Sequence, residues 1–227
     1  MKTLYLEAIE RYTTSNDLLT LIILLVLLLL VLAKKMFQPR FEDFVSLITS
    51  GKYMVIKSRE HKALFGFNIL MLIIHILSIS LFLFILYRGY VTSNIENTGM
   101  ILLRIITGYS FFVLLKIFVE KIIANVFDID EYIDHYLFQK HTYRNFISII
   151  LFPISIFLVY MDNLSNVLLY ILLGLLITAM ILTFVRIIIK NEGQVSRNWF
   201  YFILYLCALE ITPYIILYKL FTTSKGL

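Results

Sequence analysis

Six runs of apolar residues, separated by short polar stretches, dominate the chain. They cover residues 18–33, 64–87, 99–119, 146–161, 164–185 and 199–218. A helix that crosses the hydrocarbon core of a bilayer needs about 20 apolar residues, and each run reaches or approaches that length. The pattern therefore predicts an all-α membrane protein with one domain over residues 1–227, built as a bundle of about six transmembrane helices.

The first run has the charge order of a retained anchor. Acidic residues precede it and basic residues follow it: Glu7, Glu10 and Asp17 on one side, Lys34 and Lys35 on the other. A cleaved signal peptide has its positive charge before the apolar region, so this order argues against cleavage. Because the run has only about 16 residues, a full crossing depends on the two lysines reaching the headgroups.

The distribution of Lys and Arg predicts the orientation of the bundle. The first, third and fifth connections hold thirteen of these residues, whereas the two termini and the second and fourth connections hold five. Cytoplasmic connections carry the excess of positive charge, so the odd-numbered connections are predicted to be cytoplasmic. Both termini then lie on the periplasmic side. If the first run does not cross, five helices remain and the N-terminus moves to the cytoplasm.

Two of the predicted cytoplasmic connections have apolar residues at helical spacing. Over 41–48 these are Phe41, Phe44, Val45 and Ile48, and over 126–137 the period returns with acidic residues between the apolar ones. Such segments are typical of short amphipathic helices that lie on a membrane surface. They are also candidates for docking a protein partner.

Composition supports lipid as the solvent of this chain. Apolar residues make up 60% of it, charged residues 15%, and the mean hydropathy is +0.89. The net charge of +5 does not predict nucleic-acid binding, because the basic residues are scattered among connections that face anionic headgroups. Membrane lipids are the expected surroundings. The single cysteine, Cys207, excludes an intramolecular disulfide.

Two ionisable residues stand at the same predicted depth in the membrane. His75 and Glu210 each lie eleven residues into a run that enters from the cytoplasmic side, hence about 16 Å deep. Polar residues share their helix faces: Asn68 and Ser78 with His75, and Tyr214 with Glu210. An ionisable side chain at this depth costs about 2.5–3.5 kcal/mol and normally faces the bundle interior and a partner.

Arg104 and two prolines complete the polar candidates. Arg104 lies five residues into the third run and can turn inward towards Glu210 or outward to the headgroups. Pro153 and Pro213 are predicted to kink their helices and to leave a carbonyl free one turn earlier. Three interpretations remain open: a structural pair, a proton or ion relay through Glu210 and His75, and contact with a ligand or lipid headgroup.

Sequence motifs of catalysis are not recognisable. Glu131 and His135 have the i, i+4 spacing of metal ligands, but an acidic surface helix produces that spacing readily by chance. Glycine loops that cradle phosphates are lacking. We therefore expect no catalytic residues, no metal and no cofactor.

The stretch Leu206-Cys207-Ala208-Leu209-Glu210-Ile211-Thr212-Pro213-Tyr214, continuing through Ile216-Leu217-Tyr218-Lys219, resembles the last helix of a family of multi-pass membrane proteins. That family is domain of unknown function 4271 of the Bacteroidota. The resemblance covers roughly residues 50–220 and includes the segment from Arg104 to Tyr109. It implies a bacterial inner membrane and, because the family has no assigned activity, nothing about chemistry.

Two functions fit these features. The favoured one is a non-enzymatic subunit or scaffold of an envelope complex, with a protein partner in the membrane or envelope. The alternative is a small proton- or ion-coupled transporter or a lipid flippase that uses Glu210.

Overall fold

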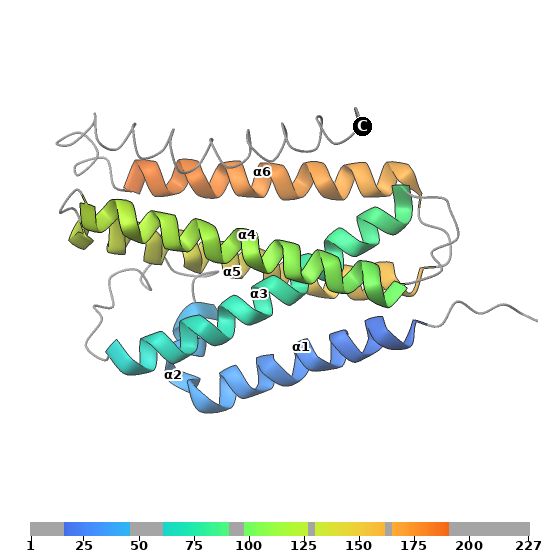
Figure 1. Cartoon of the computed structure of the whole chain (residues 1–227), viewed down its shortest axis with the longest axis horizontal. Coiled ribbons are helices and arrows are strands. Elements are labelled where there is room, and N and C mark those ends of the chain that lie inside the picture. The colour runs from blue at the N-terminus through green and yellow to red at the C-terminus, as the bar shows by residue number, and fades with distance from the viewer. Residues whose placement is uncertain (1–15, 46–60, 91–97, 127–129, 162–164, 191–227) are drawn as a thin grey trace, which may run out of the picture.

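The computed structural model describes residues 16–45, 61–90, 98–126, 130–161 and 165–190. Within these ranges the regular secondary structure is entirely helical (Figure 1). The helices are α1 (Asp17–Met36), α2 (Gln38–Val45), α3 (His61–Tyr90), α4 (Thr98–Val126), α5 (Asp130–Val159) and α6 (Asn166–Lys190). The predicted all-α class is confirmed.

Four of these helices are long and apolar enough to cross a membrane. They are Asp17–Met36, Gly66–Gly89, Thr98–Ile122 and Lys140–Val159, and they correspond to the first four predicted runs. The fifth run falls in α6, whose apolar stretch Val167–Thr183 is shorter. The sixth run, 199–218, lies outside the described residues. The total of six crossings therefore stays a prediction.

The fourth candidate span, Lys140–Val159, belongs to a longer helix than the sequence pattern indicated. The sequence predicts a separate surface helix over 126–137, yet residues 130–137 belong to α5, which runs without a break from Asp130 to Val159. The expectation of a separate helix was wrong, because no Gly or Pro stands between Asp130 and Phe152 to end a helix once it has begun. α4 extends to Val126, beyond residue 119, for the same reason.

The helix predicted over 41–48 is confirmed over its described part, 41–45, which belongs to a short helix of its own, and residues 46–48 lie outside the described residues. α2 spans Gln38–Val45 and follows α1 directly, with only Phe37 between them. Phe37 and Phe44 meet Phe67 of α3 edge-on, with ring centroids 6.0 and 6.3 Å apart, and Phe44 meets Phe146 of α5 at 6.2 Å. These aromatic contacts hold the α1–α2 corner against the bundle.

Glycine lets α3 approach this corner. A Cβ on Gly66 would lie 3.0 Å from Cζ of Phe37, closer than side chains normally pack. The glycine therefore sits where the ring of Phe37 covers α3.

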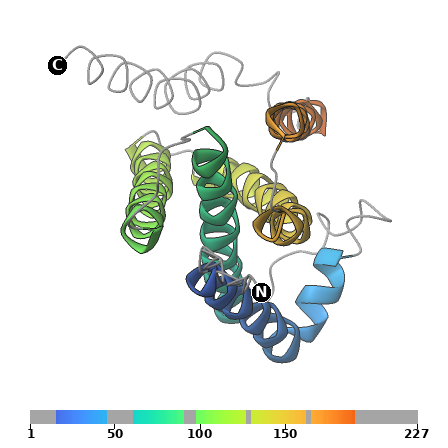
Figure 2. The same ribbon diagram turned by 90° about the vertical axis from the view of Figure 1, so that its right-hand side faces the viewer.

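α3 is the central helix of the described bundle. It packs against α1, α4, α5 and α6, and the end-on view shows it between α4 and α5 with α1 beside it (Figure 2). The long helices alternate in direction, so the C-terminal ends of α1, α4 and α6 lie at the same end as the N-terminal ends of α3 and α5 (Figure 1). Short connections between helices favour this antiparallel arrangement.

The buried core follows the central position of α3. Met71, Ile74, Leu81, Phe84 and Ile85 of this helix are almost fully buried. Small buried serines also lie at the interfaces of α3 and α5, namely Ser78, Ser80, Ser148 and Ser155, where they allow the backbones to approach closely.

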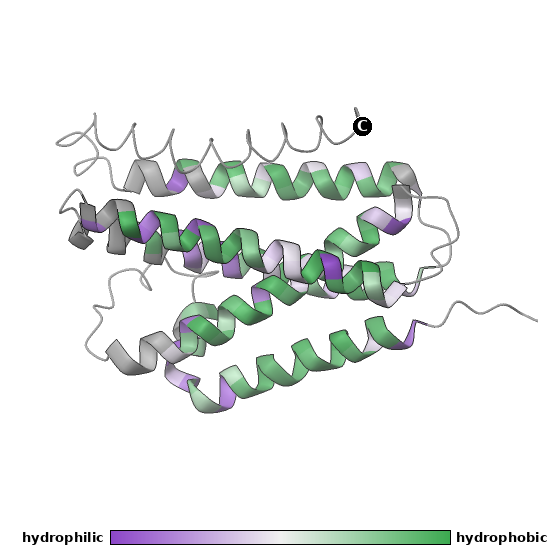
Figure 3. Cartoon of the chain, in the orientation of Figure 1, coloured by the Kyte–Doolittle hydropathy of each residue, from purple (hydrophilic) through white to green (hydrophobic). Residues whose placement is uncertain are grey.

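The outward faces of the long helices are apolar. Figure 3 shows hydrophobic residues along most of α1, α3, α4 and α6, with polar residues concentrated towards helix ends. Large side chains such as Phe111, Phe118 and Phe157 are more than 60% exposed. A surface of this kind suits contact with lipid, because water would not solvate it.

Candidate polar site at the α3–α4–α5 interface

His75 is buried near the middle of Gly66–Gly89, the part of α3 that is long and apolar enough to cross a membrane. Its side chain is 2% exposed, and Nε2 lies 2.8 Å from the hydroxyl of Tyr109 on α4. The two rings are also in contact, with centroids 5.8 Å apart. The tertiary structure thus gives the buried histidine a hydrogen-bonding partner from a neighbouring helix, as a polar group at this depth requires.

The residues predicted to share the face of His75 have different surroundings. Ser78 is fully buried one turn beyond it, whereas Asn68, two turns before it, is exposed. The structure therefore keeps Ser78 beside His75 in the interior and leaves Asn68 at the surface.

A buried ion pair joins α4 to α5 closer to one end of the bundle. Glu120 is 1% exposed, and its Oε1 lies 2.5 Å from Nζ of Lys140, which is 15% exposed. The sequence alone relates Glu120 only to Lys116, which stands one turn earlier on the same helix. The sequence does not predict Lys140 as the partner of Glu120, because the fourth apolar run begins only at residue 146 and Lys140 lies in the connection before it.

Polar residues of α5 connect the two pairs. The guanidinium of Arg144 lies close enough to His75 and His141 for its positive charge to act on both imidazoles, and the ammonium group of Lys140 is near His141 as well. Asn145 and Ser148 continue along the same helix as buried polar residues. The result is a polar seam, which we define as His75, Tyr109, Glu120, Lys140, His141 and Asn145.

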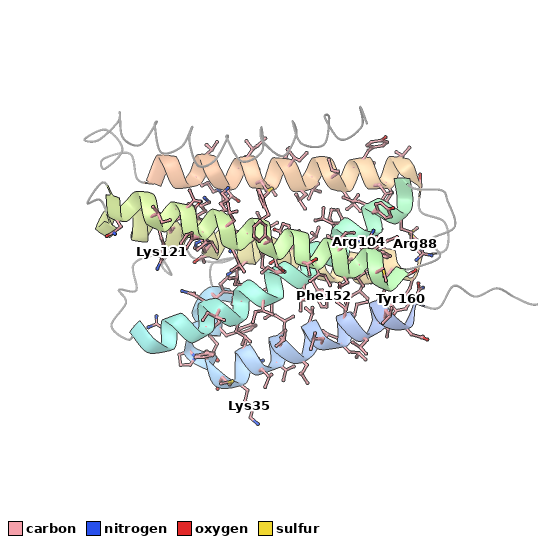
Figure 4. All side chains as sticks on the ribbon, in the orientation of Figure 1. Lys35, Arg88, Arg104, Lys121, Phe152 and Tyr160 are labelled. Carbon is pink, nitrogen blue, oxygen red and sulfur yellow. The ribbon has the colours of Figure 1, made fainter. Side chains whose placement is uncertain are left out.

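Arg104 is not part of this seam. It is exposed, and it lies near the end of the bundle that also carries Arg88 and Tyr160 (Figure 4). The position suits a guanidinium that extends along the helix to the headgroups. Tyr160 contributes to that end by a contact with α1, where its hydroxyl lies 2.9 Å from Oγ1 of Thr20.

Pro153 lies inside α5, and the helix continues through it to Val159. The proline is exposed, so its ring faces away from the neighbouring helices. The remaining predicted site residues, Glu210, Pro213 and Tyr214, lie outside the described residues, and the proposed relation of Glu210 to His75 stays a prediction.

The profile of a domain of unknown function (DUF4271) matches residues 19–221, which is most of the chain. The chain belongs to the DUF4271 family. Neither a curated protein nor a solved structure matches it.

The polar seam of this DUF4271 protein has a limited range of chemistry. Among the described residues, no three His, Cys, Asp or Glu side chains gather as metal ligands would. The seam does place two imidazoles, a phenol, a carboxylate and an ammonium group in a low-dielectric interior. Such groups can fix helix contacts through hydrogen bonds, and they can exchange protons.

Proposed function

We propose that this chain is a non-enzymatic subunit or scaffold of an envelope complex, embedded in the bacterial inner membrane. The observation that carries the proposal is the pairing of buried polar groups across helix interfaces: His75 with Tyr109, and Glu120 with Lys140. Each pair joins two helices and determines which of their faces meet. Polar groups used in this way define a rigid bundle, which is what a platform for other proteins needs.

We further propose that the end of the bundle carrying Lys35 and Lys121 faces the cytoplasm. The charged ends of the helices favour this orientation, since Lys34, Lys35, Lys121 and Arg186 lie there and Arg88 and Arg104 lie towards the other (Figure 4). In this orientation α2 and the N-terminal turns of α5 extend on the cytoplasmic side. They are the segments we expect a partner to contact.

Purification from the native membrane in a mild detergent tests the scaffold proposal. We expect a tagged chain to recover one partner in a fixed molar ratio that persists through size-exclusion chromatography. The Phe44→Ala variant locates the contact, because it removes a buried ring that holds α2 against α3 and α5. Loss of the partner in the folded variant would assign the contact to α2. A wild-type chain that elutes alone would contradict the proposal.

A second candidate function is proton- or ion-coupled transport through Glu210. The observation that favours it is the position of His75 near the middle of the crossing Gly66–Gly89, buried and hydrogen-bonded through only one ring nitrogen among the described residues. Purified protein in liposomes that contain a pH-sensitive dye tests this function. Proton flux that Glu210→Gln abolishes would support it, and flux equal to that of empty liposomes would reject it.

A further inference from the structure

Several polar atoms of the interior lack a hydrogen-bonding partner among the residues that the structure describes. They include Nδ1 of His75, Oγ of Ser78, Nδ1 of His141, Oδ1 of Asn145 and Oε2 of Glu120. Each is fully shielded from bulk solvent within the fold. A buried polar atom without a partner costs about 1–3 kcal/mol, so several of them in one region need an explanation.

These atoms are not spread evenly through the molecule. They belong to α3, α4 and α5, and they extend from His75, near the middle of the span Gly66–Gly89, to Glu120, which precedes Lys121 in the sequence. Tyr109, the partner of His75, and Glu120 are eleven residues apart on α4, hence about 16 Å along the helix axis. The row therefore covers about half the thickness of the hydrocarbon core.

Two other buried serines, both in α5, do have hydrogen-bonding partners within their own helix. Oγ of Ser148 donates to the backbone carbonyl of Asn145, and Oγ of Ser155 donates to the backbone carbonyl of Leu151. These side chains satisfy themselves within their own helix and need nothing else. Ser80 has an unsatisfied Oγ as well, but it stands about 200° around α3 from Ser78 and so belongs to a different interface.

We infer that a file of internal water molecules occupies the polar seam and reaches His75 from the Glu120–Lys140 end. Water donates and accepts hydrogen bonds, so it can satisfy imidazole nitrogens, an amide oxygen and a carboxylate oxygen in sequence, as buried waters do in polar interiors. The site is thus a hydrated inlet that ends at His75. It goes beyond the scaffold proposal, which requires only the two direct pairs.

The ion pair at the start of the inlet is compatible with water entering there. The Glu120–Lys140 pair stands at the start of the inlet, and an ion pair of this kind is itself stabilised by hydration of its remaining oxygen and N–H groups. Water within the inlet would place His75 in proton exchange with the cytoplasmic side. This exchange is available whether or not the chain transports anything.

Radiolytic hydroxyl-radical footprinting of the full chain in nanodiscs tests the inference, because X-rays generate radicals from water wherever it lies, including inside a protein. The rate of oxidation of His75 is measured by mass spectrometry and normalised to its rate in denatured protein. Phe84, which is 1% exposed, is the control for a dry buried site. We expect His75 to be oxidised severalfold faster than Phe84, and equal normalised rates would overturn the inference.

Two variants test the route. Asn145→Leu replaces an amide whose oxygen has no partner among the described residues with an apolar side chain, and it should lower the oxidation of His75 severalfold. Ser155→Ala is the matched control, because Ser155 is equally buried in α5 but already bonded to its own helix. It should leave oxidation of His75 unchanged. Oxidation of His75 that is unaffected by Asn145→Leu would overturn entry from this end. The wild-type comparison with Phe84 needs no variant to fold.

Discussion

The ion pair between Glu120 and Lys140 makes a quantitative prediction about stability. Lys140→Met removes the positive charge and leaves the carboxylate of Glu120, which is 1% exposed, without its interhelical partner. Removing one member of a buried pair costs about 3–5 kcal/mol. We expect the lower end, about 3 kcal/mol, because Lys116 stands one turn before Glu120 on α4 and can compensate in part.

The opposite substitution should cost less. Glu120→Gln leaves the ammonium group of Lys140, which is 15% exposed and lies at the edge of its crossing. A lysine in that position can extend to the headgroups, whereas the carboxylate cannot leave the interior. Replacing both residues, as Glu120→Leu with Lys140→Met, removes both charges together and should return stability close to wild type.

Thermal unfolding in detergent, followed by the loss of the monodisperse peak in size-exclusion chromatography, measures these differences. A cost of about 3 kcal/mol corresponds to a fall in midpoint of about 6–12 °C for a chain of this size. Lys121→Met is the matched control, since Lys121 is exposed and adjacent to Glu120 in the sequence. It should change stability by less than about 0.5 kcal/mol. Equal midpoints for Lys140→Met and Lys121→Met, or a double variant as unstable as Lys140→Met, would refute the reasoning.

Three further predictions concern packing, hydrogen bonding and orientation. Gly89→Ala should destabilise the fold by about 1–3 kcal/mol, because its new methyl group would overlap Cδ1 of the buried Leu169. Gly108→Ala should be neutral or slightly stabilising, because a Cβ there meets nothing within 4 Å. The same thermal assay compares the two variants. A double-mutant cycle of His75→Phe and Tyr109→Phe should give a coupling free energy of about 0.6–1.7 kcal/mol, and a value of zero would show that their hydrogen bond contributes nothing. A protease site added at the C-terminus should be cleaved from the periplasmic side of spheroplasts, and protection there would reverse the proposed orientation.

The long apolar runs determined much of the secondary structure. In lipid every backbone N–H and C=O must be satisfied within its own segment, so an uninterrupted apolar run of sufficient length has helix as its stable form. This rule depends only on local composition. It correctly predicted α1, α3 and α4 and the existence of α5 and α6, and the amphipathic period of 41–48 indicated α2.

The limits of local reasoning appear where a helix outlasts its apolar run. α5 begins at Asp130, sixteen residues before the run at 146–161, because helix propagation is stopped by Gly, Pro or competing contacts and not by polarity alone. As a result Lys140 and His141 were placed in a connection, although they lie on the same helix as Pro153.

The polar site depended on tertiary structure. Depth along a helix can be read from the sequence, and His75, which the sequence predicts at mid-depth, is buried in the structure. The partners of buried groups cannot be read in this way: Tyr109 is 34 residues from His75, and Lys140 is 20 residues from Glu120. Which faces of α3, α4 and α5 meet is decided by the packing of side chains across all their interfaces at once, and that packing joins residues that no sequence spacing relates.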